Sequence, residues 1–154
     1  MNTQFLLPHK FKKPGWILLI IGVIAGILMN LFEIEADYFG KAKVLAIYSE
    51  GFFTEDSFFK IIKNGLLDEI ISIFIIIGGI LVGFCKTKDE DEFISSLRLS
   101  SLVWSVYVNY GILLFAIVFI FDMTFMNVMI YNLFTMLLFF IIRFHILLHK
   151  ANRL

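Results

Sequence analysis

The residues most able to do chemistry in this 154-residue chain are a few polar side chains at the edges of, or inside, long apolar stretches. The strongest group consists of three carboxylates, Glu33, Asp68 and Glu69, which lie near the ends of two such stretches. Carboxylates in such places can bind a cation or a proton, and Asn30 could add an amide to the same cluster. Simple pairing with nearby lysines is the alternative interpretation.

A second set of polar side chains falls at helical spacing in the last two apolar stretches. Its members are Ser101, Ser105 and Asn109 in one stretch, and Asn132, Thr135 and Arg143 in the next. Because residues four or eleven positions apart share a helix face, each subset forms a polar stripe. We expect the stripes to face each other or a shared cavity, since amide and charged groups rarely face lipid. They either hydrogen-bond to set the helix register, or line a polar cavity, a ligand pocket or a conduction path.

Metal and catalytic motifs are weak. His145 and His149 are four residues apart and could share a metal or a haem, but no third ligand accompanies them. The single Cys85 excludes an intramolecular disulfide and a CxxC motif. HExxH, GxSxG and glycine-rich phosphate loops are absent from the sequence. We therefore predict no catalytic residues and no cofactor, and an enzyme is disfavoured.

The composition excludes an ordinary soluble domain. Apolar residues make up 60% of the chain and charged residues 17%, and the mean hydropathy is +0.90. Soluble domains are about 45–50% apolar and about 25% charged. The 13 basic and 13 acidic residues also argue against a nucleic-acid-binding surface. We expect a single-domain integral membrane protein whose main surroundings are the lipid bilayer.

Four apolar stretches approach or exceed the roughly 20 residues that cross a bilayer. They cover residues 15–33, 66–85, 99–121 and 125–148. Asp122 and Thr124 separate the last two and are suited to cap a tight helical hairpin. The sequence predicts an all-α protein, residues 1–154, with four transmembrane helices in an up-down bundle.

The basic residues predict the orientation of the chain. Most of them lie before the first stretch, between the second and third, and after the fourth. The positive-inside rule then puts both termini in the cytoplasm. The first stretch is long and no small-residue cleavage site follows it, so we interpret it as a retained helix and not a signal peptide. High Phe, Ile and Lys usage favours a bacterial inner membrane.

Two connecting segments have structure of their own. In the external segment 34–65, the apolar run Val44 to Tyr48 could be a strand or an irregular lid. From Asp56 or Ser57 onwards, helical spacing of apolar residues predicts either a helix on the membrane surface or an extension of the second span. On the inner side, the acidic run 89–92 predicts a solvated turn and helix cap, or else a partner for basic residues such as Arg98.

Two GxxxG motifs indicate close helix packing. They are Gly22 with Gly26 in the first span and Gly79 with Gly83 in the second. Small residues one turn apart let two helix backbones approach closely in lipid. The contact could join spans one and two of one chain, or it could form an oligomer interface.

Together these patterns predict a small non-enzymatic inner-membrane protein that acts through helix-mediated assembly with itself or with another membrane protein. It would serve as a subunit, a sensor or a membrane effector. The alternative is a small transporter or oligomeric channel that uses the polar faces of spans three and four.

Overall fold

The computed structural model is mostly helical and describes residues 6–35, 38, 40–51, 54–88 and 90–151. Its elements are the short helix η2 (His9–Phe11), α1 (Lys12–Leu31), β1 (Lys41–Gly51), β2 (Thr54–Gly65), α2 (Leu67–Phe84), α3 (Glu92–Phe119) and α4 (Asp122–Ala151). All four α-helices are long and apolar enough to cross a membrane. This confirms the four predicted spans as helices and indicates a multi-pass membrane protein.

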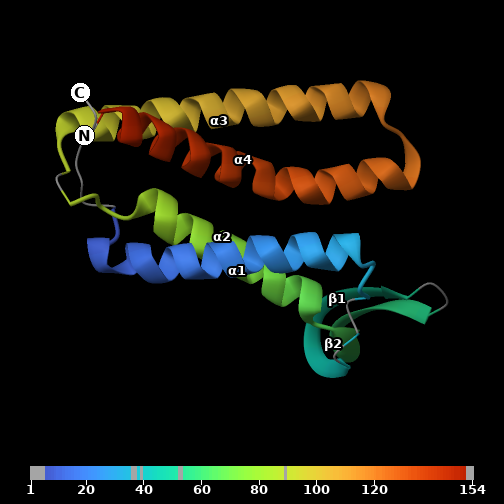
Figure 1. Ribbon diagram of the computed structural model, residues 1–154. Helices are drawn as coiled ribbons and strands as arrows, with labels where there is room; N and C mark the ends of the chain where they lie inside the picture. The colour runs from blue at the N-terminus through green and yellow to red at the C-terminus, as the bar shows by residue number, and fades with distance from the viewer. Residues whose placement is uncertain (1–5, 36–37, 39, 52–53, 89, 152–154) are drawn as a thin grey trace.

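The helices are arranged as two neighbouring pairs (Figure 1). One pair is α1 with α2 and the other is α3 with α4, while α2 and α4 connect the pairs. We call the end of the bundle where α1 begins and α4 finishes the terminal end. The opposite end, next to the two strands, is the hairpin end (Figure 1).

The apolar core lies where α1, α2 and α4 meet. Its buried side chains are Leu19, Ile71, Ile75, Val82, Phe140, Ile141 and Phe144. Most other large apolar side chains of the four helices point outward and are exposed. That distribution is unfavourable in water and normal in lipid, because lipid tails are as apolar as the side chains themselves.

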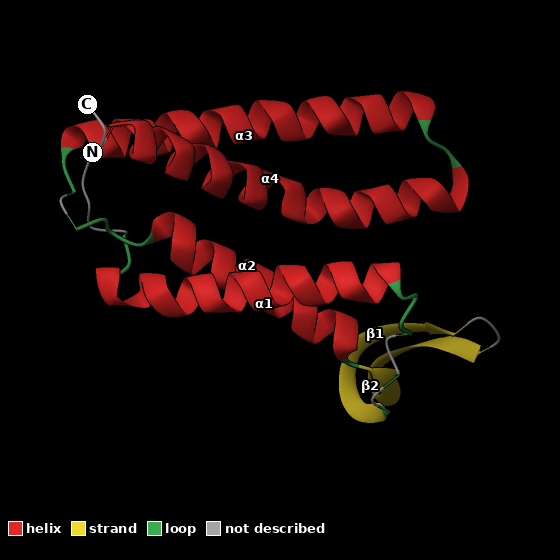
Figure 2. Cartoon of the chain, viewed as in Figure 1, coloured by secondary structure: helices red, strands yellow, loops and turns green. Residues whose placement is uncertain are grey.

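Residues 41–65 form a β-hairpin, and this corrects two predictions. The helix expected from Asp56 or Ser57 is wrong, because Thr54–Gly65 is a strand that pairs antiparallel with Lys41–Gly51 (Figure 2). The chain is therefore not all-α. The register pairs Val44 with Ile62 and Leu45 with Ile61. Two runs rich in β-branched and apolar residues, which favour strands, thus form backbone hydrogen bonds with each other. Of the two alternatives for the run Val44 to Tyr48, the strand is correct.

The link between α3 and α4 is as short as the sequence predicts. Helix α3 ends at Phe119 and α4 begins at Asp122, which leaves two connecting residues. Asp122 has a φ of 59°, in the left-handed region that Asp and Asn tolerate better than most residues.

At the terminal end, the segment before α1 is joined to the α2–α3 linker. The Leu7 N–H donates to the Phe84 carbonyl at 3.0 Å, and the Lys86 N–H donates to the Leu7 carbonyl at 2.9 Å. These two bonds form a short parallel bridge beside Cys85. They attach the linker to the start of the first helix pair.

Candidate ligand-binding cavity and polar clusters

The first glycine motif lies against α2. A Cβ on Gly22 would stand 3.0 Å from the Ile75 backbone nitrogen, so the two helix backbones are in close contact there. Gly26 is looser, with the nearest atom, a methyl carbon of Ile71, at 3.5 Å. On α2, Gly78 makes the close contact with α1, since a Cβ added to it would lie 2.5 Å from the Leu19 backbone nitrogen.

The second glycine motif lies against α4 instead. A Cβ on Gly79 would meet Cγ of Leu137 at 2.8 Å, and one on Gly83 would meet Cε1 of Phe140 at 2.6 Å. The two GxxxG motifs therefore do not contact each other. Helix α2 packs on α1 through one set of glycines and on α4 through another, and both sets are occupied within the chain.

The two serines of the α3 polar stripe are buried and hydrogen-bonded within their own helix. Ser101 and Ser105 are 0% exposed. Their hydroxyls donate to carbonyls of their own helix, Leu97 at 2.8 Å and Leu102 at 2.6 Å. Such bonds satisfy a buried hydroxyl and leave little need for a ligand.

Arg143 joins the two polar stripes. Its Nη1 donates to the hydroxyls of Ser100 at 3.3 Å and Ser101 at 3.4 Å. The guanidinium also lies 5.5 Å from the centre of the Trp104 ring, within cation–π range. The charge of Arg143 is thus held between α4 and α3.

The remaining stripe residues are less fully satisfied. Thr135 donates to the Tyr131 carbonyl of its own helix at 3.1 Å. Oδ1 of Asn109 and Nδ2 of Asn132 are buried, and neither has a hydrogen-bond partner among the described residues. One hydrogen-bond acceptor on α3 and one donor on α4 are therefore unsatisfied within the described residues.

A buried ion pair lies at the terminal end. Arg98 Nη1 donates to Glu90 Oε1 at 2.7 Å, with side-chain exposures of 5% and 9%. Arg98 also donates to the Cys85 carbonyl at 3.3 Å, and its guanidinium lies 5.0 Å from the centre of the Phe144 ring. Pairing with Arg98 was one of the two roles that the sequence predicted for the acidic run 89–92. The other role, a helix cap, is taken by Asp91, which accepts from the Ile94 N–H at 2.7 Å.

The pKa of Glu90 lies below its ordinary value. Burial opposes ionisation, but the hydrogen bonds from Arg98 and from the backbone and hydroxyl of Thr87 outweigh it. Glu90 is therefore a stable carboxylate and has a structural role.

The two histidines do not come together as a metal site. His145 Nδ1 is bonded to the Ile141 carbonyl at 2.9 Å, and its ring makes an edge contact with Trp16 at 5.1 Å. His149 is exposed. Among the described residues no group of three or more His, Cys, Asp and Glu side chains could hold a metal ion.

The structure places two of the three predicted carboxylates at one cavity and the third beside Asp68, whose side chain interacts with it. Glu33 and Asp68 line a cavity of about 770 Å³ between α1, α2 and α4 at the hairpin end. Glu69 is not among its lining residues and accepts from the Asn64 amide at 2.7 Å.

The cavity also gains groups from α4 that the sequence did not associate with it. The Asn30 amide donates to the Tyr131 hydroxyl, which joins α1 to α4 beside the cavity. Tyr131 and Thr135 line it from α4, and Ser72 lines it from α2. The polar types of these residues were visible in the sequence, but their common location was not.

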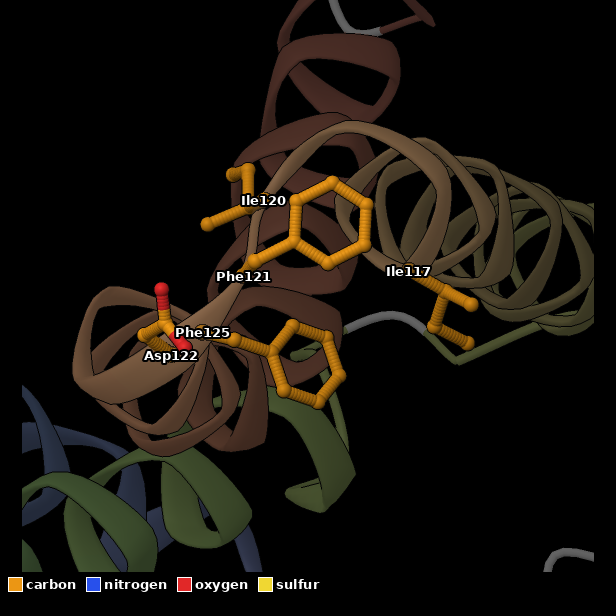
Figure 3. Close-up of a pocket in the computed structure, with 5 residues that line it drawn as sticks. All are labelled: Ile117, Ile120, Phe121, Asp122 and Phe125. Carbon is orange, nitrogen blue, oxygen red and sulfur yellow. The ribbon is translucent and has the colours of Figure 1, made fainter.

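A second, smaller hollow of about 200 Å³ lies at the α3–α4 turn (Figure 3). It is lined by Ile117, Ile120, Phe121, Asp122 and Phe125. With one carboxylate among apolar side chains, it is below the roughly 300–1,000 Å³ that ligand pockets usually have.

Comparison of the chain with protein-family models, with curated proteins and with solved structures gives no match. We therefore infer the function from the geometry of the chain itself.

Proposed function

We propose that this chain is a non-enzymatic, multi-pass protein of a bacterial inner membrane that acts by assembling with a second copy of itself, as a subunit, sensor or effector. The four helices form an up-down bundle with both termini in the cytoplasm, and the β-hairpin lies outside. The length and hydropathy of the helices and the distribution of lysines and arginines support this arrangement.

The observation that carries the assembly proposal is the position of two tyrosines. Tyr107 and Tyr110 lie near the middle of α3 and are 67% and 58% exposed. No hydrogen bond of either hydroxyl to another described residue is found. In hydrocarbon an unpaired hydroxyl costs free energy that water would otherwise offset, so a partner surface is favoured there.

A second copy is a suitable partner for this face. A hydroxyl both donates and accepts, so two identical tyrosine faces related by a two-fold axis can satisfy each other. The glycine motifs are already used inside the chain, which makes them poor candidates for the interface. The face also includes Trp104, whose ring contacts that of Tyr107 edge-on at 6.4 Å.

The test removes the two hydroxyls. Tyr107→Phe with Tyr110→Phe keeps the rings and should weaken dimer formation about tenfold, since hydrogen bonds in membranes contribute about 0.6 kcal/mol each. Analytical ultracentrifugation in detergent measures the association constant. Tyr131→Phe is the matched control, because its hydroxyl already accepts from Asn30 within the chain.

A cross-linking experiment in lipid gives a second measurement. In a Cys85→Ser background, Tyr107→Cys should form a disulfide between two copies in vesicles, whereas Ile117→Cys, farther along α3, should react less. A wild-type chain that is monomeric in both detergent and vesicles would contradict the proposal.

The alternative function is transport through the polar faces of α3 and α4. The unpaired buried atoms of Asn109 and Asn132 favour it, because a passing ion or solute could use them. Asn109→Leu or Asn132→Leu should then abolish solute flux in reconstituted vesicles. Under the assembly proposal the same variants leave the association constant unchanged.

A further inference from the structure

A hollow between three of the helices has the size of a ligand pocket. It measures about 770 Å³ and lies between α1, α2 and α4 at the hairpin end. Pockets that enclose a drug-sized molecule are usually about 300–1,000 Å³. A hollow of this size leaves room for a ligand with a long apolar tail.

The wall of the cavity is largely apolar. Val23 and Ile27 line it from α1, Ile71 and Ile75 from α2, and Phe134 and Leu138 from α4. A hydrocarbon chain would contact apolar side chains from three helices here. Such a surface favours an aliphatic or aromatic tail over a polar solute.

The charges of the cavity are all negative. Glu33 follows the end of α1 and Asp68 is in the first turn of α2, both at the hairpin end. No Lys, Arg or His is among the described lining residues.

Glu33 occupies a backbone position that normally belongs to glycine. Its φ is 50°, and the Ile34 N–H donates to the Met29 carbonyl at 3.0 Å, which is the bond of a Schellman helix end. A glycine would adopt this conformation at lower cost. A carboxylate held there at a conformational cost is consistent with a role in binding.

We propose that this cavity binds a cationic amphiphile, with an ammonium headgroup between Glu33 and Asp68 and an apolar tail between α1, α2 and α4. A neutral lipid tail would contact the apolar wall and leave the two exposed carboxylates unused. A small cation would leave the apolar volume empty. Only a molecule with both parts matches the whole surface, and this match is independent of assembly through α3.

The Asn30–Tyr131 hydrogen bond joins two walls of the cavity. It connects α1 and α4, which otherwise meet closely at the other end through Trp16 and His145. The bond gives the pocket a preformed connection between α1 and α4. A preformed pocket binds with a smaller entropic cost than one that must be assembled around its ligand.

Binding is measured on the full chain in phosphatidylcholine nanodiscs with dodecyltrimethylammonium, dodecanol and tetramethylammonium as probes. Equilibrium dialysis against empty nanodiscs corrects for partition into the lipid. We expect saturable binding of the first probe, with affinity at least about tenfold above that of either of the other two, because each lacks one of the two matching parts.

Two variants test the site from opposite directions. Glu33→Gly should raise the thermal stability of the chain, because glycine suits the left-handed position, and should weaken binding of the cationic probe about tenfold. Gly26→Leu should fill the cavity and reduce binding, because an added Cβ there meets only ordinary contacts. Helicity by circular dichroism verifies that both variants are folded.

Asp122→Asn is the matched control. It removes a carboxylate from the same end of the bundle, at a similar backbone angle, but outside the cavity. Its binding should equal that of the wild type. Equal affinity for the cationic probe and dodecanol would overturn the proposal, as would full binding by folded Glu33→Gly or folded Gly26→Leu.

Discussion

Arg98 and Glu90 form a buried ion pair that joins the start of α3 to the loop preceding it, with Nη1 and Oε1 2.7 Å apart. The loop carboxylate is also held by Thr87, and the guanidinium also reaches the Cys85 carbonyl. One pair of charges thus connects the end of α2, the linker and α3.

The ion pair predicts a defined loss of stability in acid. The pKa of Glu90 is lower in the folded chain than its ordinary value of about 4.5, so ionisation favours folding. This contribution is complete above the ordinary pKa. It is lost as the pH falls through the lower, folded pKa. Unfolding in mixed micelles as a function of pH should show this loss in the wild type.

Glu90→Gln should lose that pH dependence and be less stable at pH 7. Removing one partner of a buried pair typically costs about 3–5 kcal/mol, because the other charge stays buried. Glu92→Gln, an exposed carboxylate in the same segment, is the control and should behave as the wild type. If the two variants are equally stable, the ion pair is not structurally important.

Cys85 should react slowly with alkylating reagents in the folded chain. It is 1% exposed, and burial raises the pKa of its thiol, so little reactive thiolate is present. Leu7→Pro removes the N–H that donates to Phe84 and should speed alkylation of the neighbouring cysteine. Mass spectrometry against time measures the rate. A fast reaction in the native wild type would contradict the burial of this thiol.

The glycines at the α1–α2 contact should differ sharply in how well they tolerate substitution by alanine. Gly78→Ala places a Cβ 2.5 Å from the Leu19 nitrogen and should destabilise the α1–α2 contact by about 1–3 kcal/mol. Gly26→Ala meets nothing closer than 3.5 Å and should be neutral or slightly stabilising. Titration with dodecyl sulfate in mixed micelles gives both free energies. Equal losses in the two variants would mean that α1 and α2 approach each other differently.

Replacing the unsatisfied asparagines should not harm the fold. Asn109→Leu or Asn132→Leu removes a buried polar atom that has no partner among the described residues. Stability in the same titration should therefore stay within about 1 kcal/mol of the wild type or increase. A loss of more than about 2 kcal/mol in both single variants, with strong coupling in the double variant, would show that the two amides bind each other.

The β-hairpin shows where sequence patterns fail. Apolar residues at 58, 59, 61 and 62 fit a helical face as well as they fit a strand. The competing signal is the run Lys41–Gly51, which pairs with this segment along its length. Pairing between separate segments is a non-local choice, and a short apolar run does not reveal it by itself.

The carboxylate cluster was only partly predictable for a similar reason. That Glu33 and Asp68 lie near span ends follows from hydropathy, and both line one cavity. Glu69 is adjacent in sequence yet is not part of the lining, because neighbouring residues on a helix point about 100° apart. Tyr131 could not be assigned to the cavity without knowing that α4 packs on α2 and that Asn30 of α1 reaches Tyr131.

Hydropathy and helical period are local properties, and they determined the four long helices, the tight α3–α4 turn and the lipid-like surface of this chain. Which helix faces meet depends instead on the whole packing arrangement. Only the tertiary structure therefore decided that Gly22 packs on α2 while Gly79 packs on α4, and that Arg98 is buried against Glu90. Each of these contacts joins residues from different elements, and the spacing within a single helix carries no information about its partner.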